Sequence, residues 1–483
     1  MKIILINPFL YYIKGAFGGT LHPPMGLLYL AASLEKAGFE TRVLDAEIGR
    51  IPQEEVLRYI SGFKPEMVGI TSNIASKRAA VELAQDIKKD FPSMKLIIGG
   101  PMPSIRPEAY LPYCDAVVLG EGEDIVVELA EVYSKGTSQR LREIKGICFW
   151  EGDKVVNTGR RGFIQDLDRL PFPAYHLLIP GLGQYSRRAR TRKTPMASIF
   201  TSRGCPYGCV FCDKAVHGFK FRSRSPENVL SEIEWLINKF GVKEIHIGDD
   251  LFSMDLPRAK KILDLIIRKR LNIAMILRGG VRVDRVDEEL IKKMREAGVY
   301  KAAFGVETGD MEVIKNTGKG IDLEQVVRVK NWFDREGIRV HAYFMFGLPG
   351  DTPETMQRTI DFAKELDPYV ASFNMTLPYP GTKLYDFVKN QGEFVKDPQE
   401  GTETGFFGGK AFFSLGPTHA EDVEYFYKKA VKEFYLRPKK ILELFIKCRS
   451  LGEIQWVIEG IIEVIPALLP SFLFGRTVTI SKN

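Results

Sequence analysis

Three of the six cysteines in this 483-residue chain lie within eight positions of one another. They are Cys205, Cys209 and Cys212, in the stretch GCPYGCVFCDK that covers residues 204–214. Thiolates bind soft metals, and an iron–sulfur cube normally takes four of them. Three cysteines would leave one iron open to another ligand. An open metal position is typical of a catalytic centre rather than a structural one.

A structural zinc site is the alternative interpretation of the same stretch. Such a site takes four protein ligands, often from two CxxC pairs that are far apart in the sequence. The sequence has no second CxxC and no nearby HxxxH, so His217 would have to supply the fourth ligand. The spacing therefore favours the open iron cluster, with a Cys3His zinc site as the competing hypothesis.

The other cysteines, Cys114, Cys148 and Cys448, are isolated and are expected to be ordinary buried thiols. Six cysteines in a chain of this length are too few for a secreted disulfide framework. The start, MKIILINPFL, lacks the long apolar core and the cleavage site of a signal peptide, and it predicts a buried strand instead. We therefore expect a protein of the reducing cytoplasm.

The elements that position the cysteines form an alternating series over residues 196–385. Helical patterns separate its apolar runs; one of them begins at Ser225, a residue that can N-cap a helix, and stops at Gly241. The predicted strands are 197–202, 244–250, 274–280, 302–308, 339–347 and 370–376. Strand and helix repeated in this way predict a partial (β/α)6 barrel, in which chemistry lies at the C-terminal ends of the strands. The three cysteines directly follow the first of these strands.

Residues 1–140 form a second alternating series, with amphipathic helical patterns between short apolar runs. The predicted strands are 2–7, 41–46, 67–72, 95–100 and 116–120. This alternation predicts an α/β fold with a doubly wound, Rossmann-like parallel sheet, and ligands bind such sheets beyond the carboxyl ends of the strands. No GxGxxG follows the first strand, which argues against a dinucleotide fingerprint.

Small and polar residues follow these strands, where they would let a large flat ligand approach the backbone. Tight turns use the same residue types, so the pattern has a purely structural interpretation as well. The candidate ligand contacts are Asn7, Pro8, Thr71, Ser72, Asn73, Gly99, Gly100, Pro101, Gly120, Glu121, Gly122 and Glu123.

Two further regions complete the predicted organisation. Residues 141–195 are interpreted as a proline-rich connector with a hairpin that turns at 151–153. Residues 386–483 are predicted to be mostly helical and end in an apolar run at 454–475. Glutamates and prolines interrupt that run, so we do not expect it to span a membrane. A substrate lid, a membrane-surface contact and a helix packed on the barrel remain as hypotheses for it.

The net charge of +7 is unevenly distributed. Between Lys428 and Arg449 there are eight Lys or Arg residues against two Glu, and a second basic run covers 187–193. Such runs are typical of a solvated face, or of a contact with an anionic surface or substrate. No nucleic-acid-binding motif accompanies them, so we expect no nucleic-acid partner.

The cysteine stretch resembles the CxxxCxxC motif of the radical S-adenosylmethionine (SAM) enzymes, including the aromatic residue before the last cysteine. The resemblance implies a 4Fe–4S cluster on Cys205, Cys209 and Cys212, and SAM bound to the open iron through its amino and carboxylate groups. It also implies that one electron from the reduced cluster cleaves SAM to a 5′-deoxyadenosyl radical, which takes a hydrogen atom from the substrate. An electron donor such as flavodoxin or ferredoxin would then be a partner.

Matching positions suggest further SAM contacts. The resemblance places the methionine ammonium near Asp249 and Asp250, and the ribose or carboxylate near Arg282 and Asp284. Helix capping or solvent exposure could equally explain the first pair, and a simple ion pair the second. The full set that the resemblance implies is Phe211, Asp249, Asp250, Arg282, Asp284, Glu307 and Gly347. It assigns no catalytic acid or base.

The N-terminal half resembles the cobalamin-binding domain of one radical SAM subgroup, on PPMGLLYLAASLEKAG, TSN, IIGGP and VVLGEGE. It lacks DxHxxG, and His22 is its one histidine, so the resemblance implies cobalamin without a protein histidine on the lower face of cobalt. The implied activity is a C-methyltransferase that acts on a small molecule or a lipid. A cyclase, oxidase or carbon–carbon coupling enzyme is the first alternative, and a cofactor-binding sensor without turnover is the second.

Overall fold

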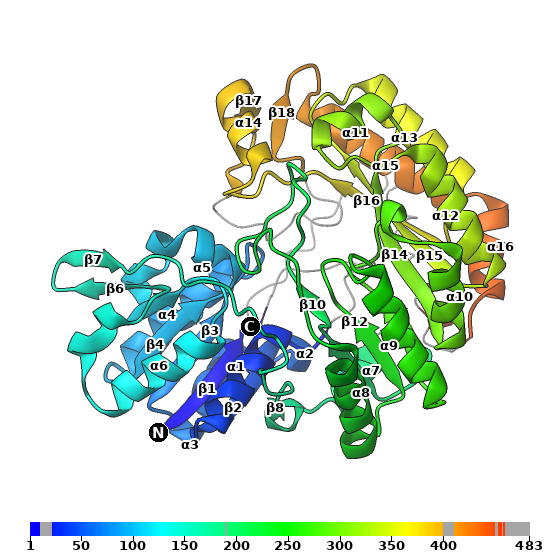
Figure 1. Ribbon diagram of the computed structural model, residues 1–483. Helices are drawn as coiled ribbons and strands as arrows, with labels where there is room; N and C mark the ends of the chain where they lie inside the picture. Colours follow the sequence, from blue (N-terminus) through cyan, green and yellow to red (C-terminus); the bar gives the residue numbers. More distant parts are fainter. Residues whose placement is uncertain (10–21, 189–190, 399–409, 450–452, 456, 459–483) are drawn as a thin grey trace.

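Two α/β units stand side by side in the computed structural model (Figure 1). The first, blue to cyan, is built from the N-terminal part of the chain, and the second, green to yellow, from its middle. The structure describes residues 1–9, 22–188, 191–398, 410–449, 453–455 and 457–458.

The first unit is an eight-stranded sheet with the order β7-β6-β5-β4-β3-β1-β2-β8. Its strands are β1 (Lys2–Asn7), β2 (Glu40–Asp45), β3 (Met67–Thr71), β4 (Lys95–Gly99), β5 (Ala116–Val118), β6 (Ile147–Glu151), β7 (Lys154–Asn157) and β8 (Leu178–Ile179). The strands from β8 to β5 are parallel. All five strands predicted from the N-terminal apolar runs are present.

Helices cover both faces of this sheet. They are α1 (Met25–Lys36), α2 (Ala46–Gly49), α3 (Gln53–Phe63), α4 (Lys77–Asp90), α5 (Pro101–Ile105) and α6 (Glu123–Ser134). Alternate residues of β1 supply the two cores: Ile3 and Leu5 pack with α1 and α6, and Ile4 and Ile6 pack with α3 and α4. This arrangement is the doubly wound architecture that the sequence predicts.

The hairpin predicted around 151–153 is present as β6 and β7, but it is also part of the sheet. β6 pairs antiparallel with β5, and β7 pairs antiparallel with β6. β8 adds a short parallel strand beside β2 at the other edge, and α7 (Gly183–Arg188) then leads towards the second unit. The segment interpreted as a connector therefore supplies three strands of this sheet, of which β7 and β8 are its two edges. The proposed boundaries at 140 and 195 remain predictions.

The second unit is a six-stranded, wholly parallel sheet with the order β16-β15-β14-β13-β12-β9. Its strands are β9 (Met196–Ile199), β12 (Glu244–Ile247), β13 (Ala274–Leu277), β14 (Val299–Glu307), β15 (Arg339–Phe346) and β16 (Val370–Met375). Among the described residues, β9 and β16 are the two edges, so the barrel is open. The six predicted strands and the partial barrel are confirmed.

Helices cover the outer face of the second sheet (Figure 1). They are α8 (Pro226–Phe240), α9 (Leu256–Arg268), α10 (Glu288–Glu296), α11 (Met311–Thr317), α12 (Leu323–Arg335) and α13 (Pro353–Leu366). The limits of α8 follow the sequence signals, because the Ser225 side chain accepts a hydrogen bond from the Asn228 amide and Gly241 is left-handed.

The two faces of the second sheet differ in polarity. Ile245 and Ile247 of β12 belong to the large apolar core, whereas His246 between them points to the opposite face. The same alternation along β15 puts Phe344 in the core and Tyr343 on the inner face. A polar inner face is what a barrel needs in order to bind a ligand there.

The C-terminal region packs at the β16 edge of the second sheet, where α15 contacts β16 and α13. It contains α14 (Lys383–Gln391), β17 (Gly392–Phe394), β18 (Phe413–Leu415), α15 (Ala420–Tyr435) and α16 (Pro438–Ile446). α15 is fixed to β16 because the Tyr435 hydroxyl donates to the Ala371 carbonyl oxygen at 2.7 Å. Most of the predicted apolar run at 454–475 lies outside the described residues.

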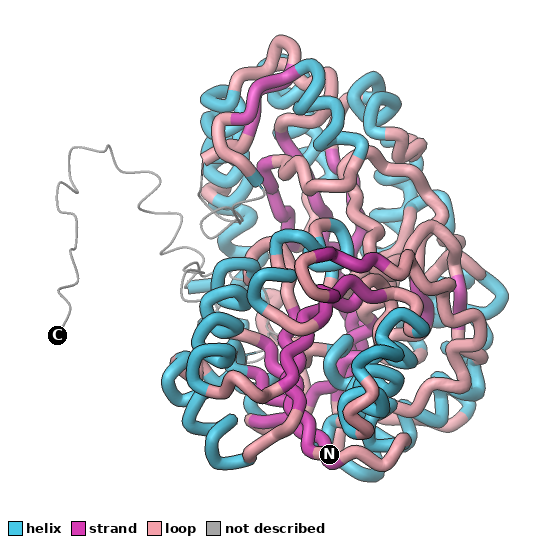
Figure 2. Tube along the Cα trace, turned by 90° about the vertical axis from the view of Figure 1, so that its left-hand side faces the viewer, coloured by secondary structure: helices cyan, strands magenta, loops and turns pink. Residues whose placement is uncertain are grey.

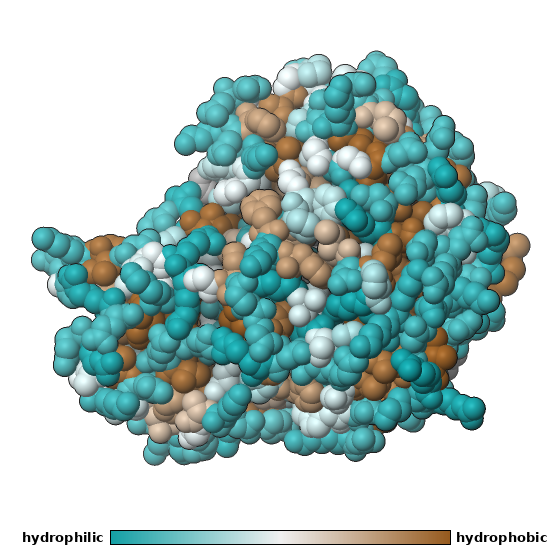
Figure 3. Space-filling model, viewed as in Figure 1, coloured by the Kyte–Doolittle hydropathy of each residue, from teal (hydrophilic) through white to brown (hydrophobic). Residues whose placement is uncertain are grey.

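Hydrophilic residues dominate the face of the molecule shown in Figure 3, and apolar residues gather between the two units. In Figure 2, turned by 90°, the strands of both units run through the centre of the molecule, with helices around them. No helix in the described part of the chain is both long and apolar enough to cross a membrane.

Candidate active site

A cavity of about 700 Å³ lies where the two units meet. The ends of the first sheet's strands line one side of it, through residues such as Thr71 and Gly99. The ends of the barrel strands line the other side, through residues such as Phe200 and Tyr343. Cys205 and Cys212 also line it. Because parallel sheets bind ligands at these ends, the fold brings two binding edges together in one space.

The cysteines are carried on a loop that a two-stranded ribbon closes. β10 (Ser202–Arg203) pairs antiparallel with β11 (Arg222–Ser223) at the base of this loop. Gly204 starts the loop with a φ of +81°, and a Cβ there would lie 2.3 Å from the Lys220 carbonyl oxygen. Lys214 Nζ donates to the Cys205 carbonyl oxygen at 2.6 Å. The loop is therefore shaped by its own backbone contacts.

All three cysteines of the loop are free thiols. Burial raises the pKa of the Cys209 thiol, whereas Cys212 is exposed to solvent. Cysteines bind metal as thiolates, so a cluster that binds this loop displaces the thiol protons.

The loop fits an iron–sulfur cluster better than zinc. His217 does not join the cysteines; its Nδ1 lies 3.3 Å from Glu121 Oε1. Within the described residues, no three Cys, His, Asp or Glu side chains are arranged to hold a single metal ion. A multi-iron cluster spans more space than one ion, so three separated thiols, two of which line the cavity, suit it.

The adjacent aspartates at the end of β12 point in different directions. Asp249 is buried, and its carboxylate accepts hydrogen bonds from the Thr201 amide and the Ser202 hydroxyl, both at 2.6 Å. Asp250 lines the cavity and accepts from the Gly204 amide at 2.9 Å. Of the two, Asp250 is positioned to meet a ligand, whereas Asp249 stabilises the segment that leads into the cysteine loop.

Arg282 contacts the cysteine loop through Tyr207. It pairs with Asp284 (Nε to Oδ1, 2.9 Å) and its guanidinium lies 3.5 Å from the centre of the Tyr207 ring, within the loop. It also donates to the carbonyl oxygen of Lys319, whose ammonium pairs with Glu307. Arg282, Asp284 and Glu307 are thus brought together beside the cysteines, although they do not line the large cavity.

The two remaining predicted SAM contacts, Phe211 beside Cys212 and Gly347 after β15, pack against other parts of the chain. Phe211 packs in a small apolar cluster with residues such as Leu377. The Gly347 amide donates to Asp351 Oδ2 at 3.0 Å, and a Cβ on Gly347 would lie 3.1 Å from Val423. Neither residue lines the large cavity.

The predicted cobalamin contacts divide into two groups. Eight of the twelve line the cavity: Thr71, Gly99, Gly100, Pro101, Gly120, Glu121, Gly122 and Glu123. The other four do not, and three of them bond within the first unit: Asn7 Nδ2 donates to Asp45, Ser72 Oγ bonds the Tyr110 hydroxyl, and Asn73 Oδ1 accepts from the Ser76 amide. Pro8 lines a small separate pocket.

Sequence reasoning missed two glycines of the cavity wall, Gly26 and Gly69. A Cβ on Gly26 would meet no atom within 4 Å, so this residue opens space along α1. A Cβ on Gly69 would lie 2.7 Å from Leu5, so this glycine is required by packing. The sequence did contain a signal for Gly26, which lies in the first turn of a predicted helix. Glycine destabilises a helix, so a glycine at that position indicates a need for space.

This wall fits a large flat cofactor. Gly100 has a φ of +115°, and a Cβ there would lie 2.5 Å from the Ser72 carbonyl oxygen, so the strand end must stay bare. Two histidines line the cavity: the Nδ1 of His22 lies 3.3 Å from Ser198 Oγ on the barrel side, and the Nδ1 of His217 lies 3.3 Å from Glu121 Oε1. A corrin bound on the first sheet would therefore lie on backbone and small side chains rather than on a histidine ligand.

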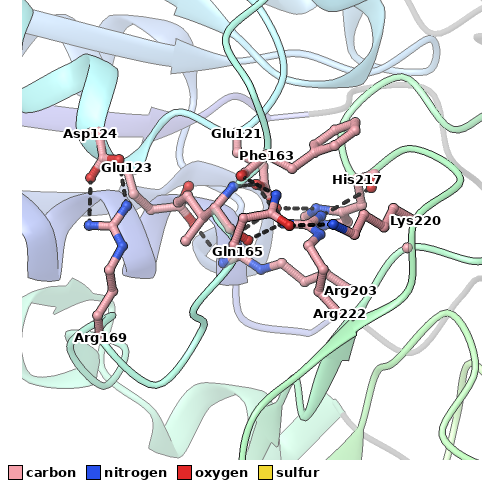
Figure 4. A network of polar contacts seen from close by, with 12 residues as sticks. Glu121, Glu123, Asp124, Phe163, Gln165, Arg169, Arg203, His217, Lys220 and Arg222 are labelled. Atoms are coloured by element: carbon pink, nitrogen blue, oxygen red, sulfur yellow. Dashed lines mark hydrogen bonds and ion pairs between the residues drawn. The ribbon is translucent and has the colours of Figure 1, made fainter. Parts of the chain in front are cut away.

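A buried ion-pair network joins the two units beside the cavity (Figure 4). Glu121 pairs with Arg222 at 2.8 Å and with Arg203 at 3.1 Å, and Glu123 pairs with Arg203 at 2.6 Å. The arginines belong to β10 and β11, at the base of the cysteine loop. The carboxylates predicted to contact cobalamin are thus bound to the frame of the cysteine loop.

The environment of Glu121 favours its charged form. Burial alone would raise the pKa of this carboxyl group. Hydrogen bonds from His217 and Arg222, together with the charge of Arg203, instead hold the pKa well below its usual range. Glu121 therefore stays ionised at neutral pH.

Comparison with known proteins agrees with this site. The description "Radical SAM superfamily" matches residues 199–363, and "B12 binding domain" matches residues 15–130. An uncharacterised methyltransferase of Pyrococcus horikoshii, PH0819, is 32% identical over 448 residues, which are 92% of this chain and 94% of that protein. Cytidylyl-2-hydroxyethylphosphonate methyltransferase of Streptomyces wedmorensis is 28% identical and covers 83% of both chains.

Solved structures share the whole fold. The radical SAM methyltransferase TsrM from Kitasatospora setae, with tryptophan and a SAM analogue bound, aligns with a TM-score of 0.71 at 21% identity, over 91% of this chain and 90% of TsrM. The cobalamin-dependent enzyme OxsB aligns with a TM-score of 0.63 at 19% identity, over 90% of this chain and 61% of OxsB. Both cofactor-binding regions and the full-length relative lead to one conclusion: the chain belongs to the cobalamin-dependent radical SAM enzymes, which use a 4Fe–4S cluster, SAM and cobalamin.

Proposed function

We propose that this protein is a C-methyltransferase that uses cobalamin and radical SAM chemistry on a small-molecule substrate. The observation that carries the proposal is the shared cavity, which both the cysteine loop and the bare strand ends of the first sheet line. A substrate placed between them would lie within reach of both cofactors. When bound, these cofactors supply a 5′-deoxyadenosyl radical and a transferable methyl group.

In this proposal, the chain's own residues hold and orient the reactants. Cys205, Cys209 and Cys212 bind the cluster. Asp250, at the cavity edge, accepts from the ammonium group of SAM, and Arg282 with its neighbours Asp284 and Glu307 supports the nucleoside side. Fixed orientation is worth much of the rate enhancement in such reactions.

The cobalamin contacts that we propose are the eight predicted residues that line the cavity, together with Gly26. They offer an open surface rather than a metal ligand. The Glu121–Arg203 network keeps this surface in register with the cysteine loop.

Several relatives support methyl transfer, since they are a cytidylyl-2-hydroxyethylphosphonate methyltransferase, a tryptophan 2-C-methyltransferase and a hopanoid C-2 methylase. Anaerobic magnesium-protoporphyrin IX monomethyl ester cyclases from Cereibacter sphaeroides and Rubrivivax gelatinosus are 26% and 27% identical. A cyclase is therefore the second candidate. The mass of the product separates the two, because methylation adds one CH2 unit and cyclisation does not.

Anaerobic reconstitution tests the proposal. The full-length protein is loaded with iron, sulfide and hydroxocobalamin, reduced, and assayed for iron, corrin and 5′-deoxyadenosine. We expect all three, and incubation with candidate substrates should give methylated products. A protein that binds both cofactors and forms no 5′-deoxyadenosine would instead be the sensor.

We also propose a cytoplasmic location and an acidic one-electron donor of the flavodoxin or ferredoxin class. A peripheral membrane contact is proposed for the C-terminus, since Leu442, Phe445 and Ile446 of α16 are exposed beside a basic stretch. Co-sedimentation with anionic liposomes, comparing the full-length protein with a variant that carries Leu442→Ser and Ile446→Ser, tests the contact. Equal partitioning of both forms would refute it.

A further inference from the structure

Among the described residues of the barrel's inner face, Arg278 is a cation with no ion-pair partner. Arg278 follows β13 directly and lines the cavity. No carboxylate in the described ranges forms an ion pair with its guanidinium. The side chain is exposed within the cavity, so its N–H groups are accessible to a ligand.

The backbone fixes the direction of this side chain. Met275 and Leu277 of β13 belong to the large core, and Ile276 between them lies on the opposite face. By the same alternation, Arg278 follows Ile276 onto the inner face. The Arg278 amide continues the ladder by donating to the Ile247 carbonyl oxygen at 2.9 Å, so the strand geometry extends to this residue.

Two glycines, Gly279 and Gly280, follow Arg278 and change the direction of the backbone at the end of the strand. A Cβ on Gly279 would lie 1.8 Å from the Asp249 carbonyl oxygen. Gly280 has a φ of +96°, and its Cβ would lie 2.4 Å from the Ala303 carbonyl oxygen. The sequence RGG at 278–280 thus presents one arginine at the end of an inner-face strand and leaves the adjacent backbone bare.

The carboxylates near this end of the cavity bond to groups other than Arg278. Asp250, which lines the same cavity, accepts from the Gly204 amide at 2.9 Å. Glu244, on the inner face, is engaged by His246 at 2.8 Å and by the Tyr300 hydroxyl at 2.9 Å. Neither carboxylate pairs with Arg278, so its guanidinium remains available to a ligand.

From this geometry we infer that Arg278 binds an anionic group of the substrate, a carboxylate or a phosphate or phosphonate, at the barrel end of the cavity. A planar guanidinium with free N–H groups is suited to two-point recognition of such anions. The rings of Phe200 and Tyr343 line the same end and would contact an apolar or flat portion beside the anion. The inference rests on the proposed function, since it names the substrate class of the same site.

Anion binding to the reconstituted full-length protein tests the inference without the true substrate. The probes are benzoate and phenylphosphonate, with benzamide as the neutral analogue, measured by titration calorimetry. We expect at least one anion to bind at least about tenfold more tightly than benzamide, because a charged hydrogen-bonded pair is worth more than a neutral one. Equal affinity for benzoate, phenylphosphonate and benzamide would overturn the inference.

Variants identify the residue responsible. Arg278→Gln should bind the anions no better than benzamide, and Arg278→Lys should keep part of the affinity because it keeps the charge. Arg268→Gln is the matched control; Arg268 is exposed at the end of α9, the helix that precedes β13. Anion affinity in Arg278→Gln equal to that of the wild type would overturn the inference. Thermal unfolding of each variant shows whether it is folded.

A parallel measurement separates the substrate from SAM, which also carries a carboxylate. SAM affinity and 5′-deoxyadenosine formation without substrate should be unchanged in Arg278→Gln. A parallel loss of SAM affinity would assign Arg278 to the SAM carboxylate and overturn the inference. If the wild type forms no 5′-deoxyadenosine at all, the proposed function fails, and the anion titrations still report on Arg278 separately.

Discussion

The two sides of the cavity are built on different principles. On the barrel side, specific side chains lie at the cavity or beside it: thiols, the Asp250 carboxylate and the Arg278 guanidinium. On the first-sheet side, glycines such as Gly26 and Gly99 leave backbone exposed. The barrel side therefore supplies chemical groups, and the first-sheet side supplies space for a ligand. Cofactor binding on the barrel side should therefore be lost when side-chain atoms are removed, and binding on the first-sheet side when atoms are added.

The largest effect is expected from removing a thiol. Cys209→Ala leaves two cysteines for the cluster, so we expect iron content and 5′-deoxyadenosine formation to fall to background. Iron analysis and the visible absorption of the reconstituted protein measure this. Cys448→Ala is the control, because Cys448 lies far along the chain in the C-terminal region. Wild-type iron content in Cys209→Ala would contradict the assignment.

The next effect concerns the network that holds the two sides together. Glu121→Ala leaves the buried guanidiniums of Arg203 and Arg222 without this carboxylate, which should cost about 3–5 kcal/mol of stability. The midpoint of urea unfolding measures the loss. Glu131→Ala removes an exposed pair with Lys135 and should change the midpoint little. Similar shifts in both variants would show that the network is not a major source of stability.

Adding atoms to the first-sheet side should have a smaller and more selective effect. Gly26→Leu places a side chain in open space along α1, and we expect cobalamin affinity to fall by at least about tenfold while the fold persists. Absorbance titration with hydroxocobalamin measures the affinity. Gly62→Leu is the matched control, since Gly62 is also helical and a Cβ there also meets no atom within 4 Å. Unchanged cobalamin binding in Gly26→Leu would place the corrin elsewhere.

The smallest effect is a pH dependence. The folded-state pKa of Glu121 lies below its ordinary value of 4.5, so its stabilising contribution is present above that value and is lost as the pH falls towards the folded-state pKa. The stability difference between the wild type and Glu121→Gln should therefore stay constant from neutral pH to about pH 5 and shrink in stronger acid. Urea unfolding over this range measures it. A difference that grows in acid would contradict the low pKa.

The second comparison is between prediction and structure. The strands of both units and the open barrel were predictable because each βα unit is local, with apolar runs and helix limits such as Ser225 and Gly241 readable in sequence. The first-sheet edges were not, because the pairing of β6 with β5 depends on where a turn directs the chain. A hairpin pattern predicts two paired strands, but it does not predict which strand of a larger sheet they will pair with.

The sequence by itself determined the chemistry: three cysteines at fixed spacing, directly after the first strand of a second βα series. That information is local, since the ligands of one cluster lie on one loop. Tertiary structure alone decided which polar residues remain available to a ligand. Asp249 and Asp250 are adjacent in sequence but differ in role, and Glu121 finds Arg203 from 82 residues away. The physical reason is that a buried polar group must be paired, and its partner is set by packing between elements that sequence spacing does not relate.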